Sequence, residues 1–305
     1  MKSIKHIIKG IPFAQDIWAM KSALEFRLFS DELFIRRAFK KKFGFTPDLE
    51  RPQTFNEKVV WRMLHDRDPV YAELSDKLAV RHFIQKAIGP EYLVELLGVY
   101  NSPKEIDFEA LPDKFVLKCN HDSASTIICH DKSKFDRKAA IRHLSRHLRQ
   151  NYYEKTREWH YGLIKPLIIC EAFLDDSGSA PRDYKIYTFG SSLEKPIFIQ
   201  CDIDRFSTHR RAMMTESWEF AKFDYKIKRP ASPPAAPENL ELMVQFARRL
   251  GAQFSMARVD FYELRGKLYF GELTFTPECG LAHFYPSEWD RNLGEIWDLN
   301  APCPL

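Results

Sequence analysis

Polar and apolar residues alternate along two neighbouring stretches of the chain, residues 256–264 and 268–276. This alternation predicts two strands, because successive side chains of a strand point to opposite faces of a sheet. Gly266 lies between the stretches and tolerates the positive φ of a tight turn. We therefore expect a hairpin with a three-residue loop, 265–267, whose odd length decides which side chains face each other.

In the expected register Asp260 lies opposite Glu272, and Arg258 lies opposite Thr274. Carboxylates that face each other across a strand pair repel, so the arrangement requires a compensating cation. A hard divalent ion held by oxygen atoms is one solution. The other is a solvated polar face whose carboxylates pair with Arg258 and Lys267, and the hairpin alone does not decide between them.

The remaining sequence alternates between helical and strand patterns, which predicts an α+β fold. Thr54 and Glu57 have the spacing of a capping box, and Gly251 marks the end of a helix. We expect helices at 57–64, about 75–87, 136–153, 237–250 and within 286–305. We expect further strands at 92–100, 114–120, 126–129, 167–174, 184–189 and 196–202.

Composition narrows the class of protein. The net charge of +4 comes from intermixed basic and acidic residues, which argues against a nucleic-acid partner. The six cysteines contain no Cys-x-x-Cys pair, so we expect reduced thiols in a cytoplasmic protein. No apolar run approaches the ~20 residues of a membrane span, and we expect no signal peptide.

The first 42 residues are basic, aromatic and helical in pattern. We favour a helical pair packed on the body of the protein. The alternative is a peripheral contact with the inner face of the membrane, or with a polysaccharide-assembly complex, through this basic N-terminus.

Five charged residues interrupt otherwise apolar strands, namely Lys118, Glu171, Lys185, Asp260 and Glu272. A buried charge needs a partner or a ligand, and five on separate strands predict a common cleft. Lysines hold phosphates, carboxylates hold Mg²⁺, and backbone N–H groups of a small-residue loop cover phosphates. The P-loop and Gly-x-Gly-x-x-Gly signatures are absent from the sequence.

The motifs that identify a family are 52–58, 75–77, 115–125, 169–174, 183–185, 200–205, 258–260 and 271–275. In this order they resemble the ATP-grasp superfamily, most closely its TupA-like branch of amidoligase-type proteins from bacterial cell-surface polysaccharide clusters. The resemblance spans about 44–290. It implies an N-terminal helical extension (1–50), an N-terminal subdomain (51–112), an ATP-grasp subdomain with a phosphate-covering loop (113–175) and a C-terminal ATP-grasp subdomain with the metal-binding hairpin (176–305).

The resemblance also implies roles for individual residues. The ATP-binding set is Lys77, Lys118, His121, Ser123, Ser125, Glu171, Ala172, Phe173 and Leu174, with adenine held by the backbone of the last three. The Mg²⁺ set is Asp260, Glu272 and Thr274, and the catalytic set is Arg258, Lys118 and Lys185. Arg258 matches the arginine that stabilises the acyl-phosphate and the oxyanion that follows.

A weaker set, Asp202, Arg205, His209 and His283, either lines the acceptor-substrate pocket or is ordinary charged and structural surface. Two motifs depart from the family pattern, at three positions. Relatives have His-Gly-Ser-Gly-Ser where this chain has Asp122 and Ala124 in place of the glycines, and Glu-x-Asn where it has Thr274.

The resemblance therefore implies an ATP- and Mg²⁺-dependent ligase that joins a carboxylate to an amine through an acyl-phosphate. Its expected substrate is a small molecule or glycan, such as a uronic acid or an amino-acid substituent of a bacterial surface polysaccharide. Two alternatives stay open: a transferase, such as a glycosyltransferase, on the same scaffold, and a non-catalytic member of the assembly complex. Mg²⁺-dependent ADP formation distinguishes the ligase from both.

Overall fold

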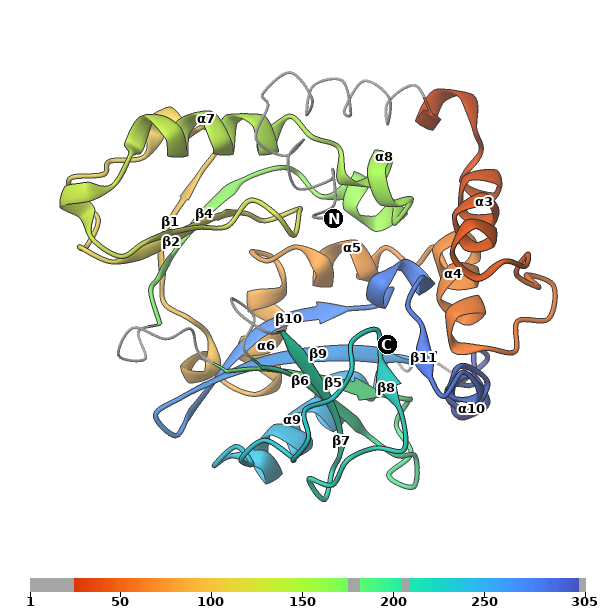
Figure 1. The fold of residues 1–305 in the computed structure, drawn as a ribbon. Helices are drawn as coiled ribbons and strands as arrows, with labels where there is room; N and C mark the ends of the chain where they lie inside the picture. The colour runs from red at the N-terminus through yellow and green to blue at the C-terminus, as the bar shows by residue number, and fades with distance from the viewer. Residues whose placement is uncertain (1–24, 175–181, 204–208, 302–305) are drawn as a thin grey trace.

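The computed structural model describes residues 25–174, 182–203 and 209–301. Its main elements are two antiparallel sheets with helices, which confirms the expected α+β class. In Figure 1 the two sheets form separate layers, with α7 (Arg137–Leu148) outside the first and α9 (Leu240–Gly251) outside the second.

The first sheet has the strand order β1-β4-β2-β3. Its strands are β1 (Leu96–Tyr100), β2 (Phe115–Cys119), β3 (Ile127–Cys129) and β4 (Ile168–Ala172). The alternation predicted for β2 is confirmed, because Phe115, Leu117 and Cys119 are fully buried in a core that includes Leu144 of α7. β1 pairs with β4, so this sheet extends across the expected subdomain boundary at 112.

The second sheet has the strand order β10-β9-β5-β6-β7. Its strands are β5 (Arg182–Thr188), β6 (Phe198–Ile203), β7 (Arg210–Thr215), β9 (Ala257–Leu264) and β10 (Lys267–Thr274). On one face Val259, Phe261 and Leu273 are buried against Met243 and Leu250 of α9. These are core positions that the hairpin pattern predicts.

The other face of the second sheet is partly covered by a second apolar core. It contains Phe55 of α4 (Phe55–His65), Tyr225 of β8 (Asp224–Tyr225), Phe284 of β11 (Phe284–Tyr285) and Leu293 of α10 (Glu288–Ile296). The rest of this face carries charged side chains, which form the site described below.

The remaining elements connect these layers. They are α3 (Asp31–Phe43), α5 (Val70–Ser75), α6 (Val80–Ala87), α8 (Tyr152–Thr156), η1 (Pro90–Tyr92), η2 (Pro103–Glu105), η3 (Lys132–Lys134), η4 (Trp159–Leu163) and η5 (Pro277–Gly280). α3 belongs to the expected N-terminal extension, whereas residues 1–24, the first part of the basic segment proposed to contact the membrane, lie outside the described residues. No helix in the described ranges is long and apolar enough to cross a membrane.

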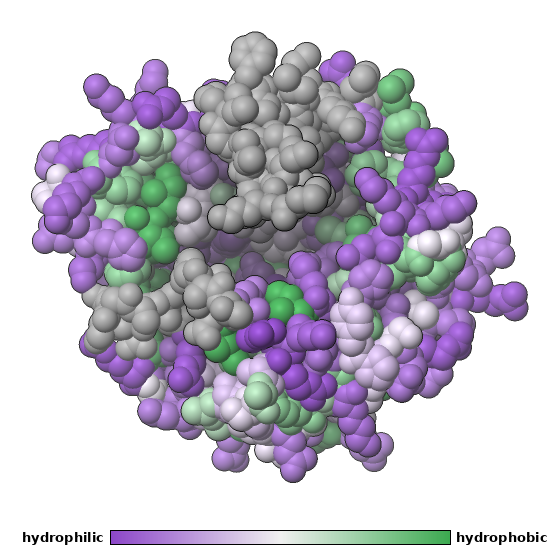
Figure 2. All heavy atoms as spheres, viewed as in Figure 1, coloured by the Kyte–Doolittle hydropathy of each residue, from purple (hydrophilic) through white to green (hydrophobic). Residues whose placement is uncertain are grey.

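Hydrophilic residues cover most of the described surface on the face drawn in Figure 2, and the apolar patches there are small and separated.

Three sequence predictions of elements were wrong in detail. The helix expected from Ser75 is split, because α5 ends at Ser75 and Asp76 then accepts a hydrogen bond from the Leu78 backbone at 2.8 Å. The long helix 136–153 stops at Leu148, and the side chain of Asn151 begins α8. β7 was not predicted at all, because two arginines obscure its alternation.

The capping box at α4 is confirmed: Thr54 accepts a hydrogen bond from the Glu57 N–H at 3.2 Å, and the Glu57 carboxylate accepts one from the Thr54 N–H at 3.1 Å. We expect Thr54→Ala to lower the free energy of unfolding by about 1 kcal/mol, because a helix N–H loses its partner. Urea denaturation measures the loss. The exposed Thr126→Ala is the control, and an equal effect of both changes would contradict the prediction.

Candidate active site

The turn between β9 and β10 differs from the expected one. Leu264 pairs with Lys267, so only Arg265 and Gly266 form the turn. Both have positive φ, 51° and 70°, as a type I′ turn requires. The predicted three-residue loop was therefore wrong.

The predicted pairing across the hairpin is nevertheless confirmed, for a different reason. Counting from a two-residue turn alone, Asp260 would face Gly271. A β-bulge between Phe270 and Glu272 shifts the register by one residue, so that Asp260 faces Glu272 and Arg258 faces Thr274. A bulge inserts one residue into one strand only, which has the same effect on register as an odd loop.

Arg258 holds the two carboxylates together. Its Nε and Nη2 donate to the two oxygens of Asp260 at 2.7 and 2.9 Å, and Nη2 also donates to Glu272 Oε1 at 2.7 Å. From the neighbouring strand β5, the Lys185 ammonium donates to Asp260 Oδ2. The Thr274 hydroxyl donates to Glu272 at 3.2 Å. All four predicted hairpin residues therefore share one face.

Burial and charge act differently on the two carboxyl groups. Burial raises the pKa of Asp260 above its ordinary value, although Arg258 and Lys185 oppose this. Burial would also raise the pKa of Glu272, but Arg258, Lys185 and Lys77 outweigh it and lower that pKa to about 2. Glu272 is therefore ionised at neutral pH.

The donor set fits Mg²⁺. This ion commonly binds one or two carboxylates together with substrate phosphates, and Asp260 and Glu272 are adjacent carboxylates with the Thr274 hydroxyl beside them. In the described part of the chain no cluster of three or more His, Cys, Asp and Glu residues could hold a metal. The remaining ligands of a bound Mg²⁺ would therefore be phosphate and water oxygens.

The first sheet contributes a second charged group. Lys118 on β2 forms an ion pair with Glu171 on β4 at 2.6 Å. Arg81 of α6 lies 3.5 Å from the same carboxylate and donates to the Val94 carbonyl at 2.8 Å. The two residues predicted on β2 and β4 are thus brought together.

Lys77 lies between the two charged groups. Its backbone N–H donates to the Asn120 carbonyl at 3.2 Å, and its ammonium donates to the carbonyl of Asp122. Burial lowers the pKa of Lys77, the Glu272 carboxylate raises it, and the Lys118 ammonium lowers it further. Lys77 is therefore close enough to Lys118 on the first sheet and to Glu272 on the second for their charges to shift its pKa.

The loop expected to cover phosphates is fastened at its base. The buried Asp122 carboxylate accepts hydrogen bonds from the Ser125 hydroxyl and from Nδ1 of His147 on α7. Burial alone would raise the pKa of Asp122, but these two hydrogen bonds outweigh it and lower the pKa. Ser125 also accepts from the Cys119 N–H at 2.7 Å. Asp122 thus points its charge into the protein.

The other loop residues differ in accessibility. Ser123 is exposed and its hydroxyl lies 2.6 Å from that of Tyr152. His121 is buried, and its Nε2 donates to the Gln150 carbonyl at 3.3 Å. Ser123 is therefore the more accessible of the two to a ligand.

The expected adenine-binding segment follows β4. The N–H of Ala172 donates to the Glu95 carbonyl at 2.9 Å, so this particular donor is already used and adenine cannot receive it. The Phe173 ring packs on His130 with centroids 4.9 Å apart. Leu174 is the last residue described before the gap at 175–181.

The four residues of the weaker substrate set, Asp202, Arg205, His209 and His283, do not all lie together. Asp202 on β6 accepts from Gln200 at 2.9 Å and from Nε of Arg211 at 2.7 Å, and His209 lies 3.0 Å away. These residues continue the polar face of the second sheet beyond Lys185, since Gln200 pairs with Lys185. Arg205 lies outside the described residues.

His283 lies apart from this face. Its ring packs against Phe43 of α3 with centroids 4.9 Å apart, and burial together with the Lys42 charge lowers its pKa. It has no contact with the residues that surround Asp260 among those described.

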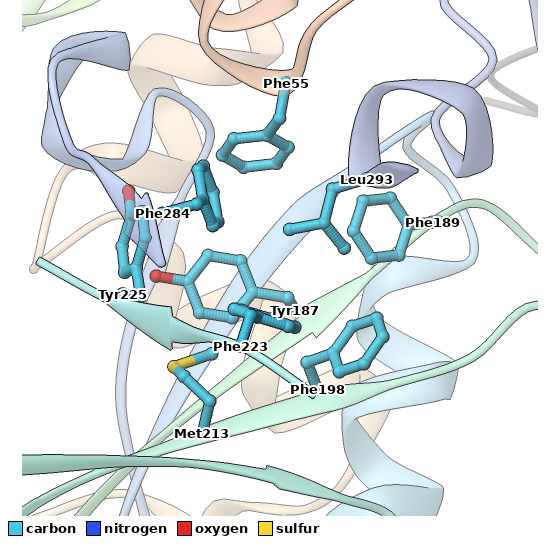
Figure 3. Close-up of a pocket in the computed structure, with 9 residues that line it drawn as sticks. All are labelled: Phe55, Tyr187, Phe189, Phe198, Met213, Phe223, Tyr225, Phe284 and Leu293. Carbon is cyan, nitrogen blue, oxygen red and sulfur yellow. The ribbon is translucent and has the colours of Figure 1, made fainter. Parts of the chain in front are cut away.

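Figure 3 shows a small cavity at the covered end of the same sheet face. Its volume is about 10 Å³, and its lining is apolar: Phe55, Tyr187, Phe189, Phe198, Met213, Phe223, Tyr225, Phe284 and Leu293. A cavity this small and apolar cannot hold a substrate.

Three residues of the charged clusters described above were not predicted from the sequence: Arg81, His147 and Arg211. Arg81 follows Lys77 by four residues, a spacing that places two side chains near each other on a helical turn. His147 lies on a helix that was predicted, but its partner Asp122 is remote in sequence. Arg211 would have been found if β7 had been recognised, because it lies opposite Asp202.

A family model described as TupA-like ATPgrasp matches residues 57–298. No curated protein sequence matches the chain. D-alanine-D-alanine ligase from Helicobacter pylori is 14% identical with a TM-score of 0.42, covering 73% of this chain and 60% of that one. Phosphoribosylamine–glycine ligase from Thermotoga maritima is 12% identical with a TM-score of 0.42, covering 72% and 55%.

This chain thus spans about 60% of the length of the Helicobacter pylori ligase. The family match covers most of the chain and includes Lys77, Lys118, Asp260 and Glu272. It confirms the expected ATP-grasp fold and the resemblance on which that expectation depended: the chain belongs to the TupA-like ATP-grasp family.

Proposed function

We propose that this protein is an ATP-dependent ligase that joins a carboxylate to an amine through an acyl-phosphate. One observation carries the proposal. The carboxylate pair Asp260 and Glu272 faces three cations. Arg258 and Lys185 of the second sheet are in direct contact with it, and Lys77, between α5 and α6, is close enough to lower the pKa of Glu272. Membership of an ATP-grasp family supports ATP as the phosphoryl donor.

In the first step the substrate carboxylate attacks the γ-phosphorus of ATP, and ADP leaves. Lys77 and Lys118 would hold ATP phosphates, which requires Lys118 to exchange its contact with Glu171 for a phosphate oxygen. Asp260 and Glu272 would hold Mg²⁺, which neutralises charge on the transferring phosphoryl group when bound. Lys185 would keep Asp260 oriented.

In the second step the amine attacks the carbonyl carbon of the acyl-phosphate, its nitrogen loses a proton to water, and inorganic phosphate leaves with the C–O bond electrons. The tetrahedral intermediate carries an oxyanion. Arg258 is the suitable donor for it, because a guanidinium stays charged and can donate several hydrogen bonds.

The proposed substrate is a uronic acid or an amino-acid substituent of a bacterial surface polysaccharide, and this part of the proposal depends on the family alone. We also propose that the protein acts in the cytoplasm, with its basic N-terminus at the inner face of the membrane or on a polysaccharide-assembly complex.

The test is ADP formation by the full-length protein. D-Glucuronate and D-galacturonate, each combined with a panel of amino acids and amines, should stimulate Mg²⁺-dependent release of ADP. ADP formation that is equal with and without these substrates would contradict a ligase. Sugar transfer from a nucleotide sugar without any ATP would favour the transferase instead.

We expect Lys118→Ala to weaken ATP binding by about 10- to 100-fold, since a hydrogen bond to a charged group contributes ~1.5–3 kcal/mol. Isothermal titration with Mg²⁺ and a non-hydrolysable ATP analogue measures this. The exposed Lys114→Ala, on the residue before β2, is a matched control and should bind as the unmodified protein does. Equal affinity for all three proteins would remove Lys118 from the site.

A further inference from the structure

Arg211 has one hydrogen-bonding edge that the protein does not use. Its Nε and Nη2 donate to the two oxygens of Asp202 at 2.7 and 3.3 Å. Its Nη1 is buried and has no hydrogen-bond partner among the residues that the structure describes. The Glu278 carboxylate lies 3.7 Å from Nη1, which is too far for a hydrogen bond.

Tyr225 has a similar unused group close by. Its side chain is 1% exposed, and its hydroxyl lacks a partner within the described ranges. The Arg211 guanidinium lies over the Tyr225 ring, 5.9 Å from its centroid. In Figure 3 the hydroxyls of Tyr187 and Tyr225 lie on the side of the cavity away from Phe189 and Phe198.

Unsatisfied polar atoms on two side chains that lie against each other are unusual, because leaving a buried polar group unpaired costs about 1–3 kcal/mol. A cost of this kind is expected where a ligand supplies the missing partner. A guanidinium edge and a tyrosine hydroxyl are both donors here, so the ligand group must be an acceptor. An anionic one is favoured by the charge of Arg211.

These donors lie beside the proposed reaction centre. Tyr187 pairs with Arg258 across β5 and β9, and its hydroxyl donates to Gln200 at 3.0 Å. The charges of Arg211 and Arg258 both lower the pKa of Tyr225, although burial raises it overall to well above its ordinary value. The Tyr187 and Tyr225 rings lie 6.2 Å apart between centroids, so Tyr225 is a neighbour of the strand position that faces Arg258.

We propose that Arg211 Nη1 and the Tyr225 hydroxyl form a subsite for a second carboxylate of a substrate, one that does not react. This subsite adds a substrate-binding group to the proposed ligase function and rests on that function. It would fix the substrate at a point away from the reacting carboxylate, so that the reacting group lies against Arg258.

Nearby acidic groups do not prevent carboxylate binding. Asp202 is already neutralised by Arg211 with His209 beside it, and Glu278 forms an ion pair with Lys226. Arg211 and Tyr225 are themselves 5% and 1% exposed, and their neighbours His209 and Glu278, at 33% and 28%, form the side of this group that faces solvent.

The carboxylate has two sources, and the probes separate them. It belongs either to an amino acid that reacts through its amine, or to a uronic acid whose single carboxylate is then not the one that ATP activates. One arm uses glycine and the nineteen chiral amino acids in their L- and D-forms, each against its carboxamide. The other uses D-glucuronate and D-galacturonate against D-glucose and D-galactose. Binding to the full-length protein is measured by thermal shift and titration, with and without Mg²⁺ and a non-hydrolysable ATP analogue.

Tyr225→Phe is the main variant, because phenylalanine keeps the ring and removes only the unpaired hydroxyl. Without ligand its unfolding midpoint should rise by about 2 °C, since a buried unsatisfied group is gone. Its affinity for the carboxylate probe should fall by about 10-fold or more, the loss expected for one hydrogen bond to a charged group. Arg211→Lys should also lose the probe.

Two controls match these variants. Tyr285→Phe changes an exposed tyrosine on β11, the partner strand of β8, and Arg210→Lys changes the exposed arginine that precedes Arg211 on β7. Both should bind the carboxylate probe as the unmodified protein does.

The outcomes are distinct. The subsite is wrong if the protein binds the ATP analogue but none of the carboxylates, or if Tyr225→Phe binds the carboxylate undiminished. Carboxylate binding that depends on Tyr225, in a protein that binds no ATP analogue, would instead overturn the proposed function and leave the subsite standing.

Discussion

Replacing Arg258 by glutamine should lower turnover by about 100-fold or more and reduce the free energy of unfolding by about 3 kcal/mol. The loss of turnover follows from removing a donor to the oxyanion, for which losses of about 10²–10³ are typical. The stability loss arises because Asp260, 2% exposed, loses its bidentate partner while Glu272 still faces it. Breaking a buried ion pair costs ~3–5 kcal/mol, and Lys185 keeps this case at the lower end.

The Arg258 variant also tests whether the carboxylate pair can hold Mg²⁺. Without the guanidinium, the two carboxylates face each other with Lys185 as the nearest cation. A ligand that binds only the native state raises stability, so Mg²⁺ alone should raise the unfolding midpoint of Arg258→Gln more than that of the unmodified protein. This readout does not depend on activity.

Arg248→Gln is the matched control for stability. Arg248 forms an ion pair with Glu216 at 2.7 Å, but that carboxylate is 46% exposed, and such surface pairs contribute ~1 kcal/mol or less. Equal destabilisation by the two changes, or a Mg²⁺ response that is the same in both, would refute the role given to the Arg258 cluster.

The hairpin illustrates how far the sequence could predict the site. Alternation identified the shared face of Arg258, Asp260, Glu272 and Thr274, and hydrogen bonds among them confirm it. The three-residue loop predicted to produce that register was wrong. The register comes from a bulge, which cannot be seen in an alternation pattern. Gly271 was the available signal, since glycine inside a strand often marks a bulge.

Contacts between distant segments were beyond the sequence. Asp122 stands in place of a glycine in the loop expected to cover phosphates, and its carboxylate accepts a hydrogen bond from His147, a residue on α7. The side-chain direction of a loop residue depends on the partner that folding brings to it, and no local pattern encodes that partner. The same reason explains why the unused edge of Arg211 and the hydroxyl of Tyr225 went unnoticed, since they come from different strands.

Acidification should destabilise this protein already below pH 6.5, and His160 should account for a large share of the loss. His160 lies on η4 between the rings of Trp159 and Tyr161, with centroids 5.8 and 4.5 Å from its own. Burial, together with the charges of Arg62 and Arg67, lowers the pKa of His160 to about 3. The native state therefore keeps this imidazole neutral.

An unfolded histidine takes up its proton near pH 6.5, so between pH 6.5 and about 3 the unfolded state binds one proton more at this residue. Stability then falls with falling pH by ~1.4 kcal/mol per pH unit, and the loss levels off below pH 3. In His160→Gln this contribution disappears. We therefore expect the free energy of unfolding of His160→Gln to fall by about 2 kcal/mol less than that of the unmodified protein between pH 6.5 and pH 5. Urea denaturation measures this, and the range lies above that in which Glu272 becomes protonated on unfolding. His82→Gln, at an exposed position of α6, should decline like the unmodified protein, and parallel curves for all three proteins would show that His160 is protonated in the native state.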